Sequence, residues 1–310
     1  MSLQLIGETC ALLTACTWAF ALVLFKRSTN HIPPLPLNIF KNVVGIMLLI
    51  TTLALGGGGA VSILDFPIED VYILVLSGVI GIAIADTLFL KALDLVGVGI
   101  ISIVDCLYSP LVILFAILML GEKMTPSLII GASLVLAGVL VSSRHTPPPD
   151  RTKSQLIGGI LLGAFTMVLM AFGIVVAKPV LEGNDYPLIW ATTIRLVGGT
   201  IALALIAVAS PARRRIWGVF RPAPVWKSSL PASVLGTYVA MILWMAGFKY
   251  ASASVVSILN QMSVVFAMLL ATWMLKERFT KRKLVSLLLA LAGALIVTNG
   301  ETLANLIGLG

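Results

Sequence analysis

Long apolar runs separated by short polar segments dominate the chain. Ten runs can be drawn, at 4–25, 35–55, 69–92, 98–120, 126–143, 156–180, 187–209, 228–249, 252–275 and 281–299. Runs of about 20 apolar residues match the hydrocarbon thickness of a bilayer, and the alternation typical of transmembrane strands is absent from them. The pattern therefore predicts an all-α membrane protein with ten transmembrane helices.

Two stretches of the chain repeat one another at a constant offset, 102–141 and 257–296. They share Ser102/Ser257, Leu120/Leu275, Glu122/Glu277, Thr125/Thr280, Leu136/Leu291, Ala137/Ala292 and Gly138/Gly293. Each half contains five expected spans, and an odd number of spans makes the second half enter the membrane from the opposite side. We therefore expect two inverted five-helix repeats, at 1–143 and 155–310, joined by a water-exposed linker at 144–154.

Composition agrees with a membrane location. Hydrophobic residues make up 59% of the 310 residues and charged residues 11%, with a mean hydropathy of +1.07, values that no soluble core of this size requires. The first apolar run is interpreted as a retained helix and not as a signal peptide. Cys10, Cys16 and Cys106 fall inside predicted helices without metal-ligand spacing, so neither a metal nor another cofactor is expected.

Basic residues are distributed unevenly between alternate loops. The net charge of +8 sits mostly in short loops beside apolar runs, where the membrane surface explains it better than nucleic acid does. Only Lys123, Lys178 and Lys249 fall on the opposite side. By the positive-inside rule both termini lie outside, and a bacterial inner membrane is the expected location, because no organelle-targeting segment is visible.

Three sequence features occur together in this chain. They are Thr17-Trp18-Ala19, a basic residue early in the second span of each half (Lys41 and Arg195), and the run Pro110 … Leu120-Gly121-Glu122-Lys123-Met124-Thr125 … Gly131 … Ala137-Gly138, echoed by Leu275-Lys276-Glu277-Arg278-Phe279-Thr280 … Ala292-Gly293. With them the chain resembles the drug/metabolite transporter superfamily, specifically its tandem EamA-type carriers. The resemblance implies a ten-helix inverted-repeat carrier with a central cavity, commonly exporting amino acids or other small metabolites. Many such relatives are described with both termini in the cytoplasm, the reverse of what the charge distribution predicts here.

Ionisable groups inside apolar runs are the first candidates for a site, because each costs at least ~2.5–3.5 kcal/mol to insert. They are Glu8, Lys41, Asp86, Asp105 and Arg195, supported by the polar pair Asn260-Gln261. Lys41 and Arg195 either snorkel to the interface, bind a substrate carboxylate, or close salt-bridge gates with Asp86 or Asp105.

Asp105 and Asn260 occupy matching positions on two stripes of small, partly polar residues. The stripes are 98, 102, 105, 109, 112, 116 and 253, 257, 260, 264, 267, 271. Either they pack closely through small residues, or they face each other across a water-filled cavity. Glu8 shares a helical face with Trp18 and is either a coupling acid or an interface carboxylate. Glu122 and Glu277 are interpreted as interfacial turn residues. The aromatic candidates for contact with a substrate are Trp18, Tyr108, Trp190, Tyr238 and Trp244.

These features favour a secondary transporter over an enzyme or a primary pump. Both histidines, His31 and His145, fall in loops, and no nucleophile elbow, zinc motif or ATP-binding loop occurs. We expect alternating access for a small polar or amphipathic metabolite, most of all export of an amino acid. The alternatives are a lipid or drug translocator, a sugar-phosphate or nucleotide-sugar exchanger, and a scaffold. Asp86 or Asp105 could carry a coupling proton, and the protein could equally be a uniporter or exchanger. Either a monomer or a homodimer in the bilayer is compatible with two fused halves.

Overall fold

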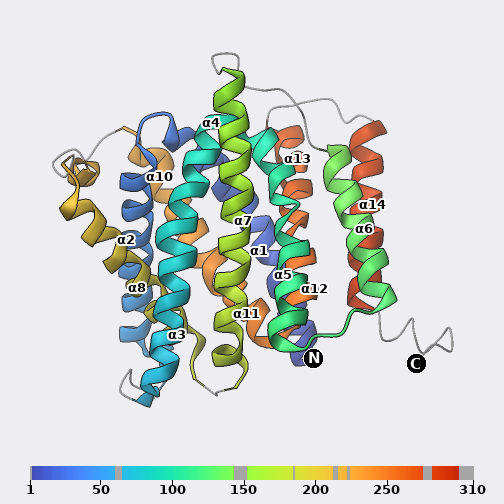
Figure 1. Ribbon diagram of the computed structural model, residues 1–310, viewed down its shortest axis with the longest axis horizontal. Coiled ribbons are helices and arrows are strands. Elements are labelled where there is room, and N and C mark those ends of the chain that lie inside the picture. Colours follow the sequence, from blue (N-terminus) through green and yellow to red (C-terminus); the bar gives the residue numbers. More distant parts are fainter. Residues whose placement is uncertain are drawn as a thin grey trace.

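The computed structural model describes residues 2–59, 65–142, 152–183, 186–211, 216–221, 224–274 and 281–299, in which every regular element is a helix (Figure 1). The first half contains α1 (Leu3–Thr29), α2 (Pro34–Thr52), η1 (Leu53–Gly57), α3 (Ile68–Gly78), η3 (Val79–Ala85), α4 (Asp86–Asp105), α5 (Tyr108–Phe115), η4 (Ala116–Leu120) and α6 (Pro126–Ser142). The second contains α7 (Lys153–Glu182), α8 (Leu188–Ala209), η5 (Gly218–Phe220), α10 (Trp226–Ser233), η6 (Val234–Val239), α11 (Ala240–Tyr250), α12 (Ala253–Asn260), α13 (Met262–Met274) and α14 (Lys281–Thr298).

Apolar helices long enough to cross a bilayer account for most of the bundle. In the described part of the chain, seven such stretches occur, at Leu3–Thr29, Pro34–Gly57, Ile68–Gly97, Ile103–Leu120, Lys153–Glu182, Leu188–Ala209 and Trp226–Tyr250. Shorter apolar helices at Pro126–Val141, Ala253–Ala267 and Leu284–Thr298 stand where the other three spans are expected. Large apolar side chains such as Leu55 and Leu118 point outward, as a surface facing lipid requires. The chain is therefore an integral membrane protein.

Two expected helices are broken in the middle. The run expected to form one helix at 98–120 is divided between α4 and α5 by a turn at Cys106 and Leu107, and the run at 252–275 is divided between α12 and α13 at Gln261. Gly97 also interrupts α4, with φ of 76°, a backbone conformation that glycine adopts without a steric penalty. Pro110 lies in the first turn of α5, where its missing N–H costs little.

The two halves interlock instead of standing side by side. The first helix of each half packs along the other half, α1 against α11 and α7 against α4, while α8 packs against α3 and α2 against η6. Glycines allow the closest of these approaches: a Cβ at Gly78 would collide with the carbonyl oxygen of Arg195, and a Cβ at Gly199 would lie 2.6 Å from that of Gly78. This contact of backbones fixes α8 at the level where Arg195 enters the bundle.

Helices α6 and α14 pair at one edge, in green and red at the right of Figure 1. A Cβ on Gly131 would lie 2.8 Å from the carbonyl oxygen of Gly293, and a Cβ on Gly138 would lie 2.8 Å from that of Ser286, whose Oγ donates to Gly138 O at 2.7 Å. Because the earlier residue of α6 meets the later residue of α14, the two helices run antiparallel.

Some sequence predictions lie outside the described residues. They include most of the 144–154 linker and the turn Lys276-Glu277-Arg278. The ten-span count and the exact limits of the two repeats stay predictions.

Candidate functional site

A cavity of about 150 Å³ lies in the interior of the bundle and is lined from both halves. Its wall includes most of the polar and aromatic residues singled out in the sequence: Trp18, Lys41, Asp86, Asp105, Tyr108, Arg195, Trp244, Asn260 and Gln261. The fold thus brings together side chains that are more than 200 positions apart in the chain. Asp86 directly follows the π-helical segment η3, and the equivalent segment η6 also borders the cavity at Gly236. Such π-helical turns are frequent at functional sites.

Glu8, Trp190 and Tyr238 lie outside the wall of this cavity. Glu8 is 4% exposed and accepts a hydrogen bond from Gln4 Nε2 at 3.0 Å. The hydroxyl of Tyr238 lies 2.6 Å from Thr52 Oγ1. Trp190 packs over Gly58, where an added Cβ would lie 2.7 Å from the indole nitrogen. The geometry therefore does not link these three side chains to the site.

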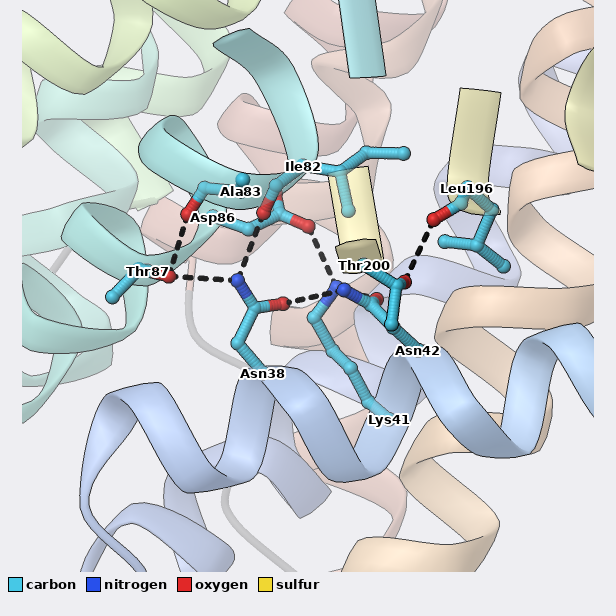
Figure 2. Close-up of polar contacts among 9 residues, drawn as sticks. All are labelled: Asn38, Lys41, Asn42, Ile82, Ala83, Asp86, Thr87, Leu196 and Thr200. Atoms are coloured by element: carbon cyan, nitrogen blue, oxygen red, sulfur yellow. Dashed lines mark hydrogen bonds and ion pairs between the residues drawn. The ribbon is translucent and has the colours of Figure 1, made fainter. Parts of the chain in front are cut away.

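Lys41 is held in an ion pair at one side of the cavity (Figure 2). Its Nζ lies 2.6 Å from Asp86 Oδ2 and also donates to Asn42 Oδ1 at 3.1 Å. Asn42 in turn donates to Asn38 Oδ1 at 3.2 Å, and Asn38 Nδ2 donates to Ile82 O at 2.8 Å. The Lys41 side chain therefore points into the bundle, anchored between α2 and η3, and does not snorkel to an interface.

Arg195 differs from Lys41 because no carboxylate lies within ion-pair distance of it in the described residues. It is 2% exposed; Nε donates to Ser77 Oγ at 2.8 Å, and Nη1 approaches Met245 Sδ at 3.5 Å. The guanidinium lies over the Trp244 ring at 4.9 Å from its centroid, a cation–π arrangement. Ser77 also donates to Gly173 O, so that its lone pairs face Arg195. The guanidinium is thereby fixed in the cavity wall while part of its donor edge stays available.

The helix breaks place unpaired oxygen atoms at the cavity. Gln261 Nε2 donates to the backbone carbonyl of Asp105 at 2.9 Å and so links the two breaks. Among the described residues, the Asp105 carboxylate has no ion-pair or hydrogen-bond partner, and neither the Tyr108 hydroxyl nor Gln261 Oε1, both buried, has one. Trp244 lies near the Tyr108 hydroxyl, but its single indole N–H points to the amide oxygen of Asn260, 3.2 Å away in the orientation that satisfies Asn260. Buried polar atoms are normally satisfied, so the oxygen atoms of these three side chains are candidates to contact a ligand.

Asn260 is committed to contacts within the protein. In the orientation that satisfies its neighbours, its amide nitrogen donates to Ala11 O at 3.1 Å and its oxygen accepts from Trp244 Nε1 at 3.2 Å. The two stripes that carry Asp105 and Asn260 meet directly at Ser109 and Ser257, whose hydroxyl oxygens are 3.3 Å apart. Close packing therefore holds along part of the stripes, and the cavity opens where the helices break.

The aromatic part of the wall is rigidly packed. Trp18 contacts Phe25 and Phe89, with ring centroids 6.1 and 6.3 Å apart, and Trp244 packs edge-on against Phe248 at 5.2 Å. The wall thus combines two indoles with a small set of fixed polar groups, which is the composition of a small-molecule site. Among the described residues, no cluster of three or more His, Cys, Asp or Glu side chains is suited to hold a metal ion.

A family model described as the EamA-like transporter family matches residues 5–144 and again residues 157–299. The chain belongs to the EamA-like transporter family. Because that family consists of membrane transporters, the cavity of this EamA-like protein is a candidate solute site and not an active site. A comparison with curated protein sequences gives no match.

The fold of this EamA-like protein is also found in a solved structure, a crystal structure titled only as that of a protein. The two share 20% sequence identity over 95% of this chain and 97% of the other, with a TM-score of 0.76. At this identity the likeness concerns the fold alone.

Sequence reasoning missed the residues that hold the site residues in place. Ser77 is uncharged and sits alone in an apolar helix, so nothing in its spacing distinguishes it from an ordinary packing residue. Asn38 and Asn42 left a signal: Asn38 lies three residues before Lys41 and four before Asn42, a spacing that puts polar side chains on one side of a helix.

Proposed function

We propose that this EamA-like protein is a secondary transporter of a small zwitterionic metabolite, most of all an amino acid, which it exports by alternating access. The solute would bind in the central cavity, with its carboxylate at Arg195 and its ammonium group at Asp105, Tyr108 and Gln261. Guanidinium groups recognise carboxylates through paired N–H donors. An ammonium group offers three N–H donors, one for each of the three side chains that carry unpaired oxygen acceptors.

One observation carries this proposal: the cavity holds one cation without a carboxylate partner and one carboxylate without a cationic partner, among the described residues. Since Lys41 and Asp86 neutralise each other at 2.6 Å, Arg195 and Asp105 are the charges left for a ligand. A ligand with both signs of charge satisfies both residues and leaves no buried charge uncompensated.

The charges and the size of the cavity also argue against the alternative functions. A sugar phosphate or nucleotide sugar carries several negative charges, but among the described residues that line the cavity only Arg195 is a cation without a carboxylate partner. A lipid or large drug would need more room than a cavity of about 150 Å³ offers, since pockets for drug-sized ligands span roughly 300–1,000 Å³. A scaffold without transport would have no use for buried unpaired oxygens.

Inverted repeats are the arrangement we propose for transport, with five spans in each half and the repeats at 1–143 and 155–310. The antiparallel pairing of α6 and α14 supports it, because the contact of Gly131 with Gly293 and that of Gly138 with Ser286 exchange under the internal repeat. The π-helical segments η3 and η6 also fall at the same offset. Such repeats move between two states by rocking around a central site.

Coupling and topology follow as further parts of the proposal. Asp105 is a better proton carrier than Asp86, because Asp86 is engaged with Lys41. The unequal distribution of basic residues supports termini outside the cell in a bacterial inner membrane. The interlocked halves form one complete cavity, so a monomer suffices, and a homodimer would not change the site.

Counterflow in proteoliposomes tests the proposal. Vesicles preloaded with unlabelled amino acids, amines, nucleosides or sugars are given a labelled member of each class, with no gradient imposed. Accelerated uptake is expected for amino acids. Replacing Arg195 by Gln should raise the KM by about 10- to 100-fold, the loss of a charge-assisted hydrogen bond. An amino-acid methyl ester lacks the carboxylate, so any residual ester transport should not change in Arg195→Gln. Equal effects on acid and ester, or no uptake of amino acids, would refute the assignment.

A further inference from the structure

The carboxylate of Glu122 joins the two halves at one end of the bundle. Glu122 lies in the turn between η4 and α6, in the first half, as expected from the sequence. Its Oε1 accepts a hydrogen bond from Ala253 N at 2.7 Å, and its Oε2 accepts from Ser254 N at 3.1 Å and from Ser254 Oγ at 2.6 Å. These donors form the first turn of α12, in the second half. Glu122 is therefore more than an interfacial turn residue: it caps a helix of the other half.

The charge of Glu122 suits this place. The exposed N–H groups at the start of a helix carry a partial positive charge, which a carboxylate stabilises. Ala253 and Ser254 are 0% and 3% exposed, so water competes little for the same donors. A charged cap in such a dry contact is stronger than one at a surface.

Lys178 binds the carbonyl groups on the other side of the turn between α11 and α12. Its Nζ donates to Phe248 O and Ala251 O, both at 2.8 Å, at the carbonyl end of α11, and it also pairs with Glu182 at 2.6 Å. The junction of α11 and α12 is thus held by a cation on its carbonyl groups and by an anion on its amide groups.

The matching turn of the first half also has a lysine at its carbonyl groups, at longer distances. There, at the interruption of α4 by Gly97, Lys26 Nζ reaches Leu93 O at 3.3 Å and Asp94 O at 3.4 Å. Its side chain is 26% exposed, whereas that of Lys178 is 2% exposed. Lys26 Nζ also lies 3.7 Å from Asp94 Oδ1. The internal repeat therefore places a lysine at the carbonyl groups of both junctions, at shorter distances in the second half than in the first.

We propose that Glu122 is a latch that keeps the cavity closed at the end of the bundle where the 121–125 turn lies, and that it must release α12 for the cavity to open there. Helix α12 starts at this latch and ends about 12 Å away at Asn260 and Gln261 in the cavity, at 1.5 Å per residue. Because α12 is broken at both ends, it can move as one short rigid piece. The contact crosses between the halves, so rocking of the halves must separate its partners. The proposal rests on alternating access, but not on which solute is carried.

Accessibility of one cysteine to a membrane-impermeant methanethiosulfonate tests the latch. The reporter is Ser263→Cys, an isosteric change in the cavity wall, in a chain whose Cys10, Cys16 and Cys106 are replaced by Ala. The rate of modification is measured with reagent on each side of the membrane. In Glu122→Gln the rate from the latch side should rise by about tenfold, as expected for the loss of one charge-assisted hydrogen bond from the closed state. An unchanged rate would overturn the proposal, even if transport itself is normal.

Glu69 supplies both the control and the reference for the two sides. It is exposed in the first turn of α3, at the same end of the bundle as the turn that carries Glu122 (Figure 1). Glu69→Gln removes the same charge at that end and should leave the rate of reporter modification unchanged. A separate Glu69→Cys chain identifies which face of the membrane is the latch side. An equal rise in Glu69→Gln and Glu122→Gln would assign the effect to surface charge and overturn the latch.

Ser254→Ala covers the case in which Glu122→Gln does not fold. This change removes only the hydroxyl donor to Glu122 and leaves the carboxylate on the two backbone N–H groups. Modification from the latch side should rise by a smaller factor, about two- to fivefold, as expected for one hydrogen bond of ordinary strength. If modification from that side does not change in Ser254→Ala, the latch is refuted.

Discussion

Replacing Lys41 by Met removes the cation that lies 2.6 Å from Asp86. The side chains of the pair are 6% and 18% exposed, so the carboxylate left behind is poorly solvated. Breaking a buried ion pair lowers the free energy of unfolding by about 3–5 kcal/mol. Because Asp86 is partly exposed, we expect Lys41→Met to lower it by about 3 kcal/mol. Asp86→Leu should cost about 2 kcal/mol, because Lys41 keeps Asn42 Oδ1 as an acceptor at 3.1 Å.

The double variant Lys41→Met/Asp86→Leu distinguishes a structural pair from two independent groups. With no charge left unpaired, its loss should be about 2 kcal/mol, well below the ~5 kcal/mol that the single changes sum to. The remaining cost comes chiefly from Asn42, which loses its donor. Unfolding of the purified protein by sodium dodecyl sulfate in mixed micelles, followed by circular dichroism, measures all three variants. Lys123→Met, at an exposed turn, is the control and should change stability by less than about 0.5 kcal/mol.

Strict additivity of the two single changes would refute the reasoning. So would a double variant that is stable but fails in counterflow, because Lys41 and Asp86 would then contact the solute. We expect the stable double variant to keep a KM for amino acids close to that of the parent. The two buried cations would then differ in role: Lys41 would stabilise the fold, and Arg195 would bind the solute.

Three further changes test the environment of Arg195 and the packing of the edge helices. Ser77→Ala removes the oxygen that holds Arg195 Nε, so the KM for amino acids should rise by about 3- to 10-fold without loss of the maximal rate; added to Arg195→Gln it should have no further effect. Met241→Asp puts a carboxylate in the cavity wall, at the position that corresponds to Asp86 in the repeat. We expect this carboxylate to pair with Arg195, as Asp86 pairs with Lys41. Arg195 is then no longer available to the solute, so the KM for amino acids in counterflow should rise by about tenfold. Gly293→Ala places a Cβ 2.6 Å from a carbonyl oxygen of α6 and should cost about 1–3 kcal/mol in the same unfolding assay, whereas Gly158→Ala, where the space is open, should not destabilise.

The helices were predictable from the sequence because bilayer-length apolar runs leave the backbone little choice but to form helices. The breaks at Cys106-Leu107 and at Gln261 were not, since neither contains Gly or Pro and both lie within apolar runs. The breaks depend on a tertiary contact: Gln261 reaches across to the backbone of Asp105. A polar residue in mid-span was the only local sign of them.

The members of the candidate site were predictable in kind but not in role. An ionisable residue in an apolar run is costly wherever it points, so Lys41, Asp86, Asp105 and Arg195 stood out equally. Only the structure separates a charge that has a partner from one that has none. The partner of Glu122 lies 131 positions away in the chain, and no local pattern announces a cap supplied from so far.

The site depends on chemistry in which the two repeats differ. Asp105 belongs to the first half and Arg195 to the second, so neither half alone provides both charges. In the proposed function the solute bridges the two and so contacts both halves, which would make its affinity depend on how the halves are placed relative to each other. Only such differential binding lets a ligand shift a conformational equilibrium. Fused halves free to diverge can place the binding charges on opposite halves, whereas two identical halves would place the same charge on both.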